Sequence, residues 1–252
     1  MKILVTAGNT QAMIDKVRCI TNVFSGRTGA QIAVEAFDRG HAVTLFTSHP
    51  EILGTVSCVR PRNTSGWQVL SYRTFEELES LMAEGVTGGS YDAVIHAAAV
   101  SDYLLSGIYA PREGITKSDS HSTANVDLTR VVDETAGKVK SHYQELWLRL
   151  QPAPKLVDKV RVAWGFAGVL VKFKLEVGVT DAELLAIAER SRVQSGADLM
   201  VANTLEGMHD WAFVGFNHAS YHRVQRNELP GHLLEEISTV ACSASKPSRQ
   251  AS

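Results

Sequence analysis

Small and polar residues follow the first apolar segment of the chain in a pattern that could hold a phosphate group. Gly8 and Thr10 come directly after an apolar run at residues 3–5, and residues 25–29 (Ser-Gly-Arg-Thr-Gly) open a stretch with helical periodicity. Glycine lets a ligand approach bare main chain, and the first turn of a helix offers N–H groups that have no partner. The pattern indicates either a phosphate site or an ordinary tight turn before a helix.

The segment between these glycines is long and polar. The distance from Gly8 to Gly26 is too great for a GxGxxG motif, and GxxxxGK[ST] is absent, so neither common phosphate motif explains the glycines. The segment carries charged, hydroxyl and amide side chains, namely Asp15, Arg18, Thr21 and Asn22. A loop of this length and polarity is more typical of a functional segment than of a simple connection.

A later strand end repeats the theme of small residues. Ala97, Ala98 and Ala99 follow an apolar run and precede Asp102. The alanines indicate either close packing of a helix on a sheet or room for a flat group or a carboxylate. Asp102 could bind Mg²⁺, which often takes one protein carboxylate and otherwise phosphate oxygens, or it could cap a turn.

Alternating strands and helices are needed to position these loops. Apolar runs predict strands at residues 2–6, 41–46, 56–59 and 91–96. Periodic segments predict helices at 26–39 and 74–84, and the second begins with Thr74 and Glu77 at capping-box spacing. This order is typical of an α/β protein with a Rossmann-like, doubly wound, mostly parallel sheet and helices on both faces. In such sheets, ligands bind beyond the carboxyl ends of the strands.

The regular pattern stops at residues 103–140, which we interpret as a flap insertion. It resumes with helices at 154–160 and 180–193, strands at 168–175 and 198–202, and a last helix at 230–240. Two short apolar runs at 211–225 predict a small C-terminal β-hairpin appendage. We therefore expect one domain over residues 1–240, with a disordered tail at 241–252.

Composition excludes several classes of function. The 252 residues are 44% hydrophobic and 21% charged, which suits a protein with a buried core. Lys and Arg number 25 against 27 Asp and Glu, so no basic field favours nucleic acid or a membrane surface. Three cysteines without a CxxC pair favour neither a disulfide framework nor a zinc knuckle. The sequence shows no signal peptide or membrane span, and we expect a cytoplasmic protein.

In their order along the chain, these segments resemble the phosphopantothenate–cysteine ligase (phosphopantothenoylcysteine synthetase) family. Its opening motif ILVTxGGTxxxIDxVRxIxNxxxGxxG is similar to residues 3–29, and its AAVxDY to residues 98–103. The flap motif K[IV]K resembles residues 138–140. Three later motifs, TPKI, GFKLxVxVT and ADLIxAN, resemble residues 153–156, 172–180 and 197–203.

The chain departs from the family pattern at two motif positions. Asn9 replaces a glycine in the first motif, and Lys172 replaces the glycine before Phe173, which leaves Phe166 as a second candidate for the nucleotide-base pocket. No flavin-binding decarboxylase domain is recognised ahead of the ligase motifs. The chain therefore resembles the stand-alone bacterial type of the family.

The resemblance implies a two-step ligation in coenzyme A biosynthesis. The carboxylate of 4′-phosphopantothenate attacks the α-phosphate of CTP (or ATP) with Mg²⁺ assisting, and cysteine then displaces CMP from the acyl-CMP intermediate. The implied catalytic residues are Asn22, Lys138 and Arg18. The implied nucleotide-binding residues are Gly8, Thr10, Ser25, Gly26, Ala98, Asp102, Phe173 and Asn203. The implied substrate-binding residues are Arg18, Asn22, Ala99 and Lys140, and the implied metal ligand is Asp102.

The resemblance also implies a homodimer, and the apolar hairpin at 211–225 could supply the contact or could pack on its own domain.

Two other classes of protein compete with the ligase interpretation. An NAD(P)- or flavin-dependent oxidoreductase on the same type of fold would be expected to show GxGxxG or YxxxK, and neither motif occurs. A nucleotide-binding protein without catalysis is the other alternative.

Overall fold

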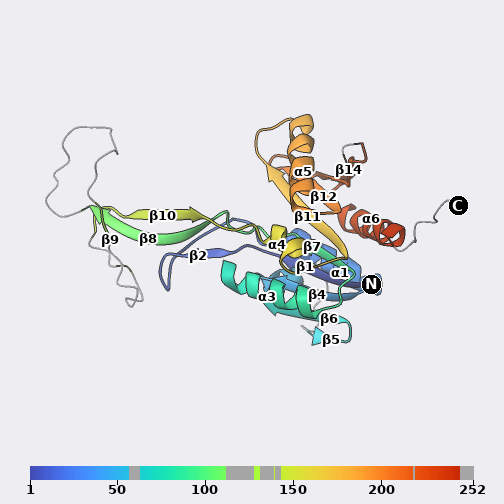
Figure 1. Ribbon diagram of the computed structural model, residues 1–252, viewed down its shortest axis with the longest axis horizontal. Helices are drawn as coiled ribbons and strands as arrows, with labels where there is room; N and C mark the ends of the chain where they lie inside the picture. The colour runs from blue at the N-terminus through green and yellow to red at the C-terminus, as the bar shows by residue number, and fades with distance from the viewer. Residues whose placement is uncertain (57–62, 112–127, 131–138, 140–142, 218, 245–252) are drawn as a thin grey trace.

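The computed structural model describes the chain apart from residues 57–62, 112–127, 131–138, 140–142, 218 and 245–252 (Figure 1). Its described part contains a nine-stranded sheet in the order β14-β13-β12-β11-β7-β1-β4-β6-β5. The neighbours from β6 to β12 pair in parallel. These parallel strands are β1 (Lys2–Ala7), β4 (Ala42–Thr47), β6 (Trp67–Ser71), β7 (Ala93–His96), β11 (Val169–Glu176) and β12 (Leu199–Thr204). The order confirms the doubly wound α/β fold.

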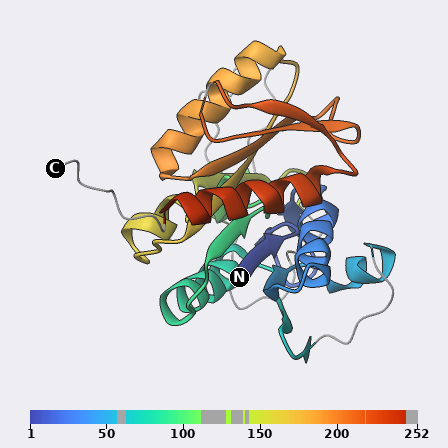
Figure 2. The ribbon, with the colours of Figure 1, turned by 90° about the vertical axis from the view of Figure 1, so that its right-hand side faces the viewer.

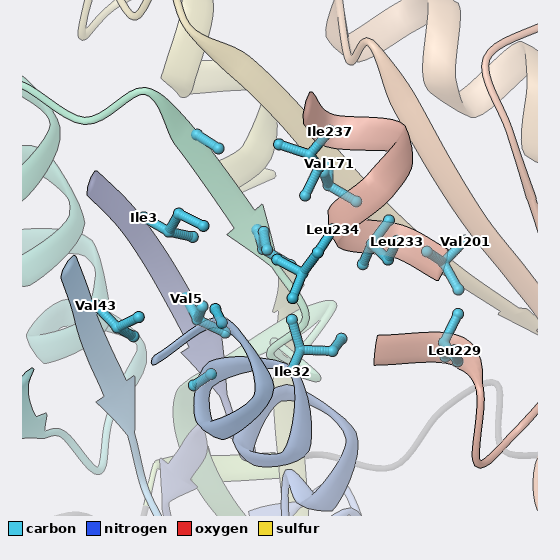
Figure 3. Packing of buried hydrophobic residues seen from close by; sticks show 14 of the residues in the cluster. Ile3, Val5, Ile32, Val43, Val171, Val201, Leu229, Leu233, Leu234 and Ile237 are labelled. Carbon is cyan, nitrogen blue, oxygen red and sulfur yellow. The ribbon is translucent and has the colours of Figure 1, made fainter. Parts of the chain in front are cut away.

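The two faces of the sheet divide the apolar side chains of each strand. On β1, Ile3 and Val5 pack in one buried cluster, whereas Leu4 points into another on the opposite face. Figure 3 shows Ile3 and Val5 along β1, in the same buried cluster as Ile32 of a covering helix. Because both faces are covered, β1 is apolar in consecutive positions instead of alternating, which is typical of a parallel sheet.

Helices cover each face. The first face carries α1 (Arg27–Asp38) and α6 (Leu229–Ala244), which lie next to one another (Figure 2). The second face carries α3 (Phe75–Gly88) and α4 (Leu156–Val162), and α5 (Asp181–Ser195) packs on β12. Thr74 and Glu77 form the predicted capping box of α3. Among the described residues, no helix combines the length and the apolar character needed to cross a membrane.

The predicted strand at residues 56–59 is wrong where the structure describes it. Val56 ends a short helix, α2 (Leu53–Val56), which follows the 3-10 helix η1 (Pro50–Ile52), and residues 57–59 lie outside the described part. The third parallel strand is β6 instead, with the short β5 (Asn63–Thr64) at its edge. Trp67 and Val69 are buried while Gln68 between them is exposed, so β6 shows the alternation of a strand covered on one side.

An antiparallel arm projects from the body at the carboxyl ends of the strands (Figure 1). It consists of β8 (Tyr103–Pro111), β9 (Leu128–Arg130) and β10 (Trp147–Pro152), with the pair β2 (Gln11–Met13) and β3 (Cys19–Thr21) close by. The flap was predicted to lack regular structure, yet its first nine residues form β8. The remainder of residues 103–140 lies outside the described part, except β9 and Val139.

The C-terminal hairpin is part of the main sheet. Strand β13 (Trp211–Gly215) pairs antiparallel with β12, and β14 (His222–Gln225) pairs with β13. Phe213, Val214 and Val224 are buried within their own domain, so the hairpin extends the sheet and is not a separate appendage. Helix α6 continues to Ala244, four residues into the predicted tail, and the rest of the tail lies outside the described part.

Candidate functional site

A cavity of about 1010 Å³ opens at the carboxyl ends of the central strands. It is lined by the loops after β1 and β7, the last residues of β11 and β12, the start of α1, and parts of α4 and α5. The strand order reverses between β1 and β7, and this point of a doubly wound sheet is where ligands bind. Several residues selected from the sequence line it, namely Gly8, Ser25, Gly26, Ala98, Ala99, Asp102, Phe173 and Asn203.

Glycines allow the loop after β1 to cross the start of α1. Gly8 and Gly26 have φ values of 93° and 80°, and a Cβ on Gly26 would lie 2.1 Å from the main-chain nitrogen of Gly8. A tight turn thus explains part of the need for glycine at these two positions. Gly26 is also the N-cap of α1, which has no side-chain cap and no acidic residue in its first turn. Arg27, Thr28 and Gly29 line the cavity, and as the first three residues of α1 their N–H groups have no intrahelical partners.

Hydrogen bonds join the loop after β3 to the loops after β1 and β7. The Asn9 side chain donates to the Asn22 carbonyl oxygen (2.6 Å), and the Asn22 amide donates to the Ala99 carbonyl oxygen (2.9 Å). Thr10 is fully buried, and its hydroxyl accepts from the Ser101 N–H at 2.8 Å. The structure thus brings four predicted residues together, Thr10, Asn22, Gly8 and Ala99, although Thr10 and Asn22 do not line the cavity itself.

Arg18 is held by Asp15 and by the main chain of Val139. Its Nε and Nη2 donate to Asp15 Oδ2 (3.0 and 2.5 Å), and Nη2 also donates to the Val139 carbonyl oxygen (3.0 Å). Asp15 accepts the Val139 N–H in turn at 3.0 Å. This contact ties the loop before β3 to the flap motif. The predicted residues Lys138 and Lys140 lie outside the described part.

Cationic side chains dominate the lining of the cavity. Asp102 and Asp158 are its carboxylates, and Asp102 accepts a hydrogen bond from Lys155. The Lys and Arg residues that line it are Arg27, Lys155, Lys172, Lys174, Arg190 and Arg226. This excess of positive charge, next to the uncapped start of α1, favours anions.

His96 and Lys172 stand opposite one another on β7 and β11 near the cavity. Burial lowers the pKa of His96 to about 4, with Lys172 contributing further, and its Nδ1 lies 2.9 Å from Thr6 Oγ1. Burial also lowers the pKa of Lys172, whose ammonium donates to the Ser191 carbonyl oxygen at 3.1 Å. His96 is therefore neutral at pH 7.

The position of the two phenylalanines bears on the base pocket. Phe173 lines the cavity, whereas Phe166 is 8% exposed and packs in the cluster beneath α3 and α4. The geometry therefore favours Phe173 as the aromatic residue beside a ligand.

Sequence reasoning did not select the lining residues Lys155, Lys174, Arg190, Met208, His209, Arg226 and Asn227. Lys155 stands within the TPKI-like motif and could have been found there.

The strand order and the cavity define a Rossmann-like α/β protein with an anion-attracting site at the reversal of its sheet. Residues 1–133 match the family model described as DNA/pantothenate metabolism flavoprotein, C-terminal domain. The match covers more than half of the 252 residues, and the chain belongs to this family. The finding confirms the family resemblance drawn from the motifs.

Three similar proteins illustrate the relationship. A Thermococcus kodakarensis protein described as coenzyme A biosynthesis bifunctional protein CoaBC is 33% identical over 242 residues, covering 94% of this chain and 50% of that protein. The chain therefore spans half the length of this relative. The crystal structure of the DNA/pantothenate metabolism flavoprotein from Streptococcus pneumoniae superimposes with a TM-score of 0.74 and 29% identity, covering 95% of this chain and 99% of that one.

A Cab2 mutant in complex with phosphopantothenate-cysteine has a TM-score of 0.63 and 17% identity, covering 96% of this chain and 86% of that one. At this identity, the likeness concerns the fold alone. The two structural comparisons agree on the fold of the chain.

Proposed function

We propose that this chain joins 4′-phosphopantothenate to cysteine, using a nucleoside triphosphate, in the biosynthesis of coenzyme A. The observation that carries the proposal is the cation-rich cavity at the uncapped start of α1. Both 4′-phosphopantothenate and a nucleoside triphosphate are anions that such a cavity attracts. Family membership supports the same activity, since a relative is named for coenzyme A biosynthesis.

The first proposed step activates the carboxylate. A carboxylate oxygen of 4′-phosphopantothenate attacks the α-phosphorus of the nucleotide, the bond from that phosphorus to the bridging oxygen breaks, and pyrophosphate leaves with the electron pair. The N–H groups of Thr28 and Gly29 and the Arg27 side chain bind phosphate oxygens. By its motif, Lys138 supplies a further cation.

The second proposed step forms the amide. The cysteine amine attacks the acyl carbon of the acyl nucleotide, and negative charge develops on the carbonyl oxygen. The bond from the acyl carbon to the phosphate oxygen then breaks, the nucleoside monophosphate leaves with the electron pair, and the nitrogen releases a proton to water. Asn22 Nδ2 carries two hydrogens, and one of them bonds to the Ala99 carbonyl oxygen. We assign the second hydrogen to the acyl oxygen. The described hydrogen bonds of Arg18 use Nε and Nη2, and we assign Nη1 to an anionic group of the substrate, with Lys140 beside it.

The nucleotide is CTP in this proposal, with ATP as the second candidate. Phe173 offers an aromatic face to the base, and Asn203 lines the same cavity from β12. The Asn203 side-chain nitrogen donates to the Thr204 carbonyl oxygen at 3.1 Å, which leaves its amide oxygen to accept from an amino group of the base. Both cytosine and adenine carry such an amino group.

We also propose Mg²⁺ as the metal, held by Asp102 together with the triphosphate. The described residues contain no group of three or more His, Cys, Asp or Glu side chains placed to hold a metal. One exposed carboxylate at the cavity fits Mg²⁺, which takes most of its ligands from phosphate oxygens and water. When bound, the ion would neutralise phosphate charge, and Lys155 would exchange its contact with Asp102 for a contact with phosphate.

A homodimer and a cytoplasmic location complete the proposal. The hairpin is less well suited to a dimer contact than the sequence indicated, because Phe213 and Val224 are already buried in their own domain. Trp211 and Tyr221 keep partial exposure, and Phe216 between the two strands is 44% exposed, so the hairpin still offers these apolar side chains. Light scattering at micromolar concentration tests the dimer, and a monomeric mass would contradict it.

One assay tests the activity. The protein is incubated with Mg²⁺, cysteine, 4′-phosphopantothenate and either CTP or ATP, and both pyrophosphate and the cysteine amide are measured. Absence of pyrophosphate with both nucleotides would defeat the ligase proposal. Thermal shifts with CTP, ATP, FMN and NADPH then separate the competing classes, because a ligand that binds only the folded state raises the unfolding temperature.

A further inference from the structure

Arg226 reaches the nucleotide cavity from the far end of the chain. It lies in the turn between β14 and α6, where its main-chain N–H donates to the Asp210 carbonyl oxygen at 2.8 Å. Its side chain lines the cavity, and Nη2 donates to the hydroxyl of Thr28 in the first turn of α1. The guanidinium is therefore held beside the helix start where we place phosphates.

The charge of Arg226 has no counterpart among the described residues. No carboxylate of that part lies within ion-pairing distance, and Nη1 is buried without a hydrogen-bond partner there. Burial lowers the pKa of this guanidinium. The first turn of α1 next to it contains no acidic residue. Two positive groups thus stand together. Arg226 is half-buried, and an unpaired charge that is partly removed from water destabilises a protein unless an ion of opposite sign joins it.

We propose that Arg226 binds the β- and γ-phosphates of the nucleotide, the part that leaves as pyrophosphate. This inference rests on the proposed function. The attacking carboxylate is assigned to the side of Asn22 and Ala99, and in-line displacement places the leaving group on the opposite side of the α-phosphorus. Arg226 contacts Thr28 at the start of α1 and takes no part in the Asn22 hydrogen bonds, so we assign it to the leaving group. A phosphate oxygen beside Thr28 supplies the missing negative partner.

Isothermal titration calorimetry with Mg²⁺ present tests this role directly. The ligands are pyrophosphate, CTP and CMP, and the proteins are the wild type, Arg226→Gln and Arg226→Lys. Arg223→Gln is the matched control, since Arg223 on β14 is an exposed arginine that pairs with Asp181 and stacks over Trp211 outside the cavity lining. The thermal stability of each ligand-free protein is measured in parallel.

Arg226→Gln is expected to weaken pyrophosphate and CTP binding by about 10- to 100-fold, the usual effect of losing charged hydrogen bonds. CMP, which has no β- or γ-phosphate, should bind within about twofold of wild type. Arg226→Lys should recover part of the loss, and Arg223→Gln should show none. Because Arg226→Gln removes an unpaired charge, the ligand-free variant should be at least as stable as wild type, whereas loss of a purely structural contact would lower its stability.

The outcomes separate this inference from the proposed function. Unchanged pyrophosphate binding in Arg226→Gln, an equal loss for CMP, or a wild type that binds neither pyrophosphate nor CTP would overturn the inference. If the wild type binds pyrophosphate through Arg226 but forms no cysteine amide, the role of Arg226 is supported and the proposed ligase activity is contradicted. The amide assay with wild-type protein is therefore run beside the titrations.

Discussion

The side-chain amide of Asn22 donates a hydrogen bond of 2.9 Å to the main-chain carbonyl oxygen of Ala99. The two residues are 77 positions apart, and the bond fixes the loop after β3 against the loop after β7. The adjacent Asn9 side chain donates to the Asn22 carbonyl oxygen and holds the same loop from its other side. The amide that we assign to the acyl oxygen is thereby oriented before any substrate binds.

Asn22→Asp should separate the two chemical steps. The replacement keeps the size but substitutes an acceptor for the N–H donor, so it loses the bond to the acyl oxygen and adds repulsion. Loss of one such donor typically costs about 10²–10³ in rate. We expect at most one pyrophosphate per site, with acyl nucleotide accumulating on the enzyme, detected by mass spectrometry after an acid quench.

Lys138→Gln provides the comparison. Lys138 lies outside the described residues, and its motif assigns it to the triphosphate, so this change should slow pyrophosphate release itself and accumulate no intermediate. Equal loss of pyrophosphate release in both variants, or normal turnover by Asn22→Asp, would contradict the division of roles.

Gly26→Ala should disrupt the crossing of the first loop and α1. A Cβ there would lie 2.1 Å from Gly8 N, and φ is 80°. Gly40→Ala is a matched control, because Gly40 has φ of 84° and nothing within 4 Å of a built Cβ. The control should lose about 1 kcal/mol of unfolding free energy from φ strain alone, and Gly26→Ala about 1–3 kcal/mol more from overpacking. Urea unfolding measures both, and equal losses would show that the close approach is unimportant.

Phe173→Ala should act on nucleotide affinity, and Phe166→Ala on stability. Phe173 lines the cavity, while Phe166 is buried in the core. Loss of base stacking is expected to weaken CTP binding by about 1–3 kcal/mol. Phe166→Ala should instead lower the unfolding free energy by about 3–5 kcal/mol and leave CTP affinity unchanged in the folded fraction. The reverse pattern would move the base to Phe166.

Asp15→Asn should remove a pH-dependent part of the stability. Hydrogen bonds from the Arg18 side chain hold the pKa of the Asp15 carboxyl well below its ordinary value of 3.8, against the opposing effect of burial, and N–H groups of Val17, Val139 and Arg18 add to the shift. A depressed pKa gives stability that is present above about 3.8 and is lost as pH falls below it. Wild type should exceed the variant in unfolding temperature at pH 7, and the difference should shrink at pH 3. A constant difference would show that charge is not responsible.

His96 should stay neutral at pH values well below 6.5, the ordinary pKa of a histidine. Burial lowers its pKa to about 4, and Lys172 adds to the shift. The neutral form therefore stabilises the fold above pH 6.5, and this contribution, up to about 3 kcal/mol, is lost as pH falls from 6.5 towards 4. NMR titration of the ring nitrogens should give a midpoint near 4, and a midpoint near 6.5 would contradict the burial argument.

Local signals in the sequence were sufficient for most of the elements. The capping box of Thr74 and Glu77 and the apolar run of β1 depend only on neighbours a few residues away, and both appear as predicted. Strand β6 was missed because its buried residues, Trp67 and Val69, alternate with polar ones over only five positions. So short an alternating pattern is a weak signal beside the continuous run of a strand buried on both faces.

The sequence by itself determined most of the elements and the family motifs, because periodicity and caps act within one or two turns. Tertiary structure decided which loops meet. Arg226 contacts Thr28, which lies 198 positions away in the sequence, and β13 pairs with β12 instead of forming a separate appendage. Both contacts depend on the order of the strands in the sheet. The strand order results from the burial of apolar faces against elements that are distant in the chain, so it cannot be predicted from a short sequence pattern. The unpaired charge at the start of α1 therefore emerges only once the sheet is assembled.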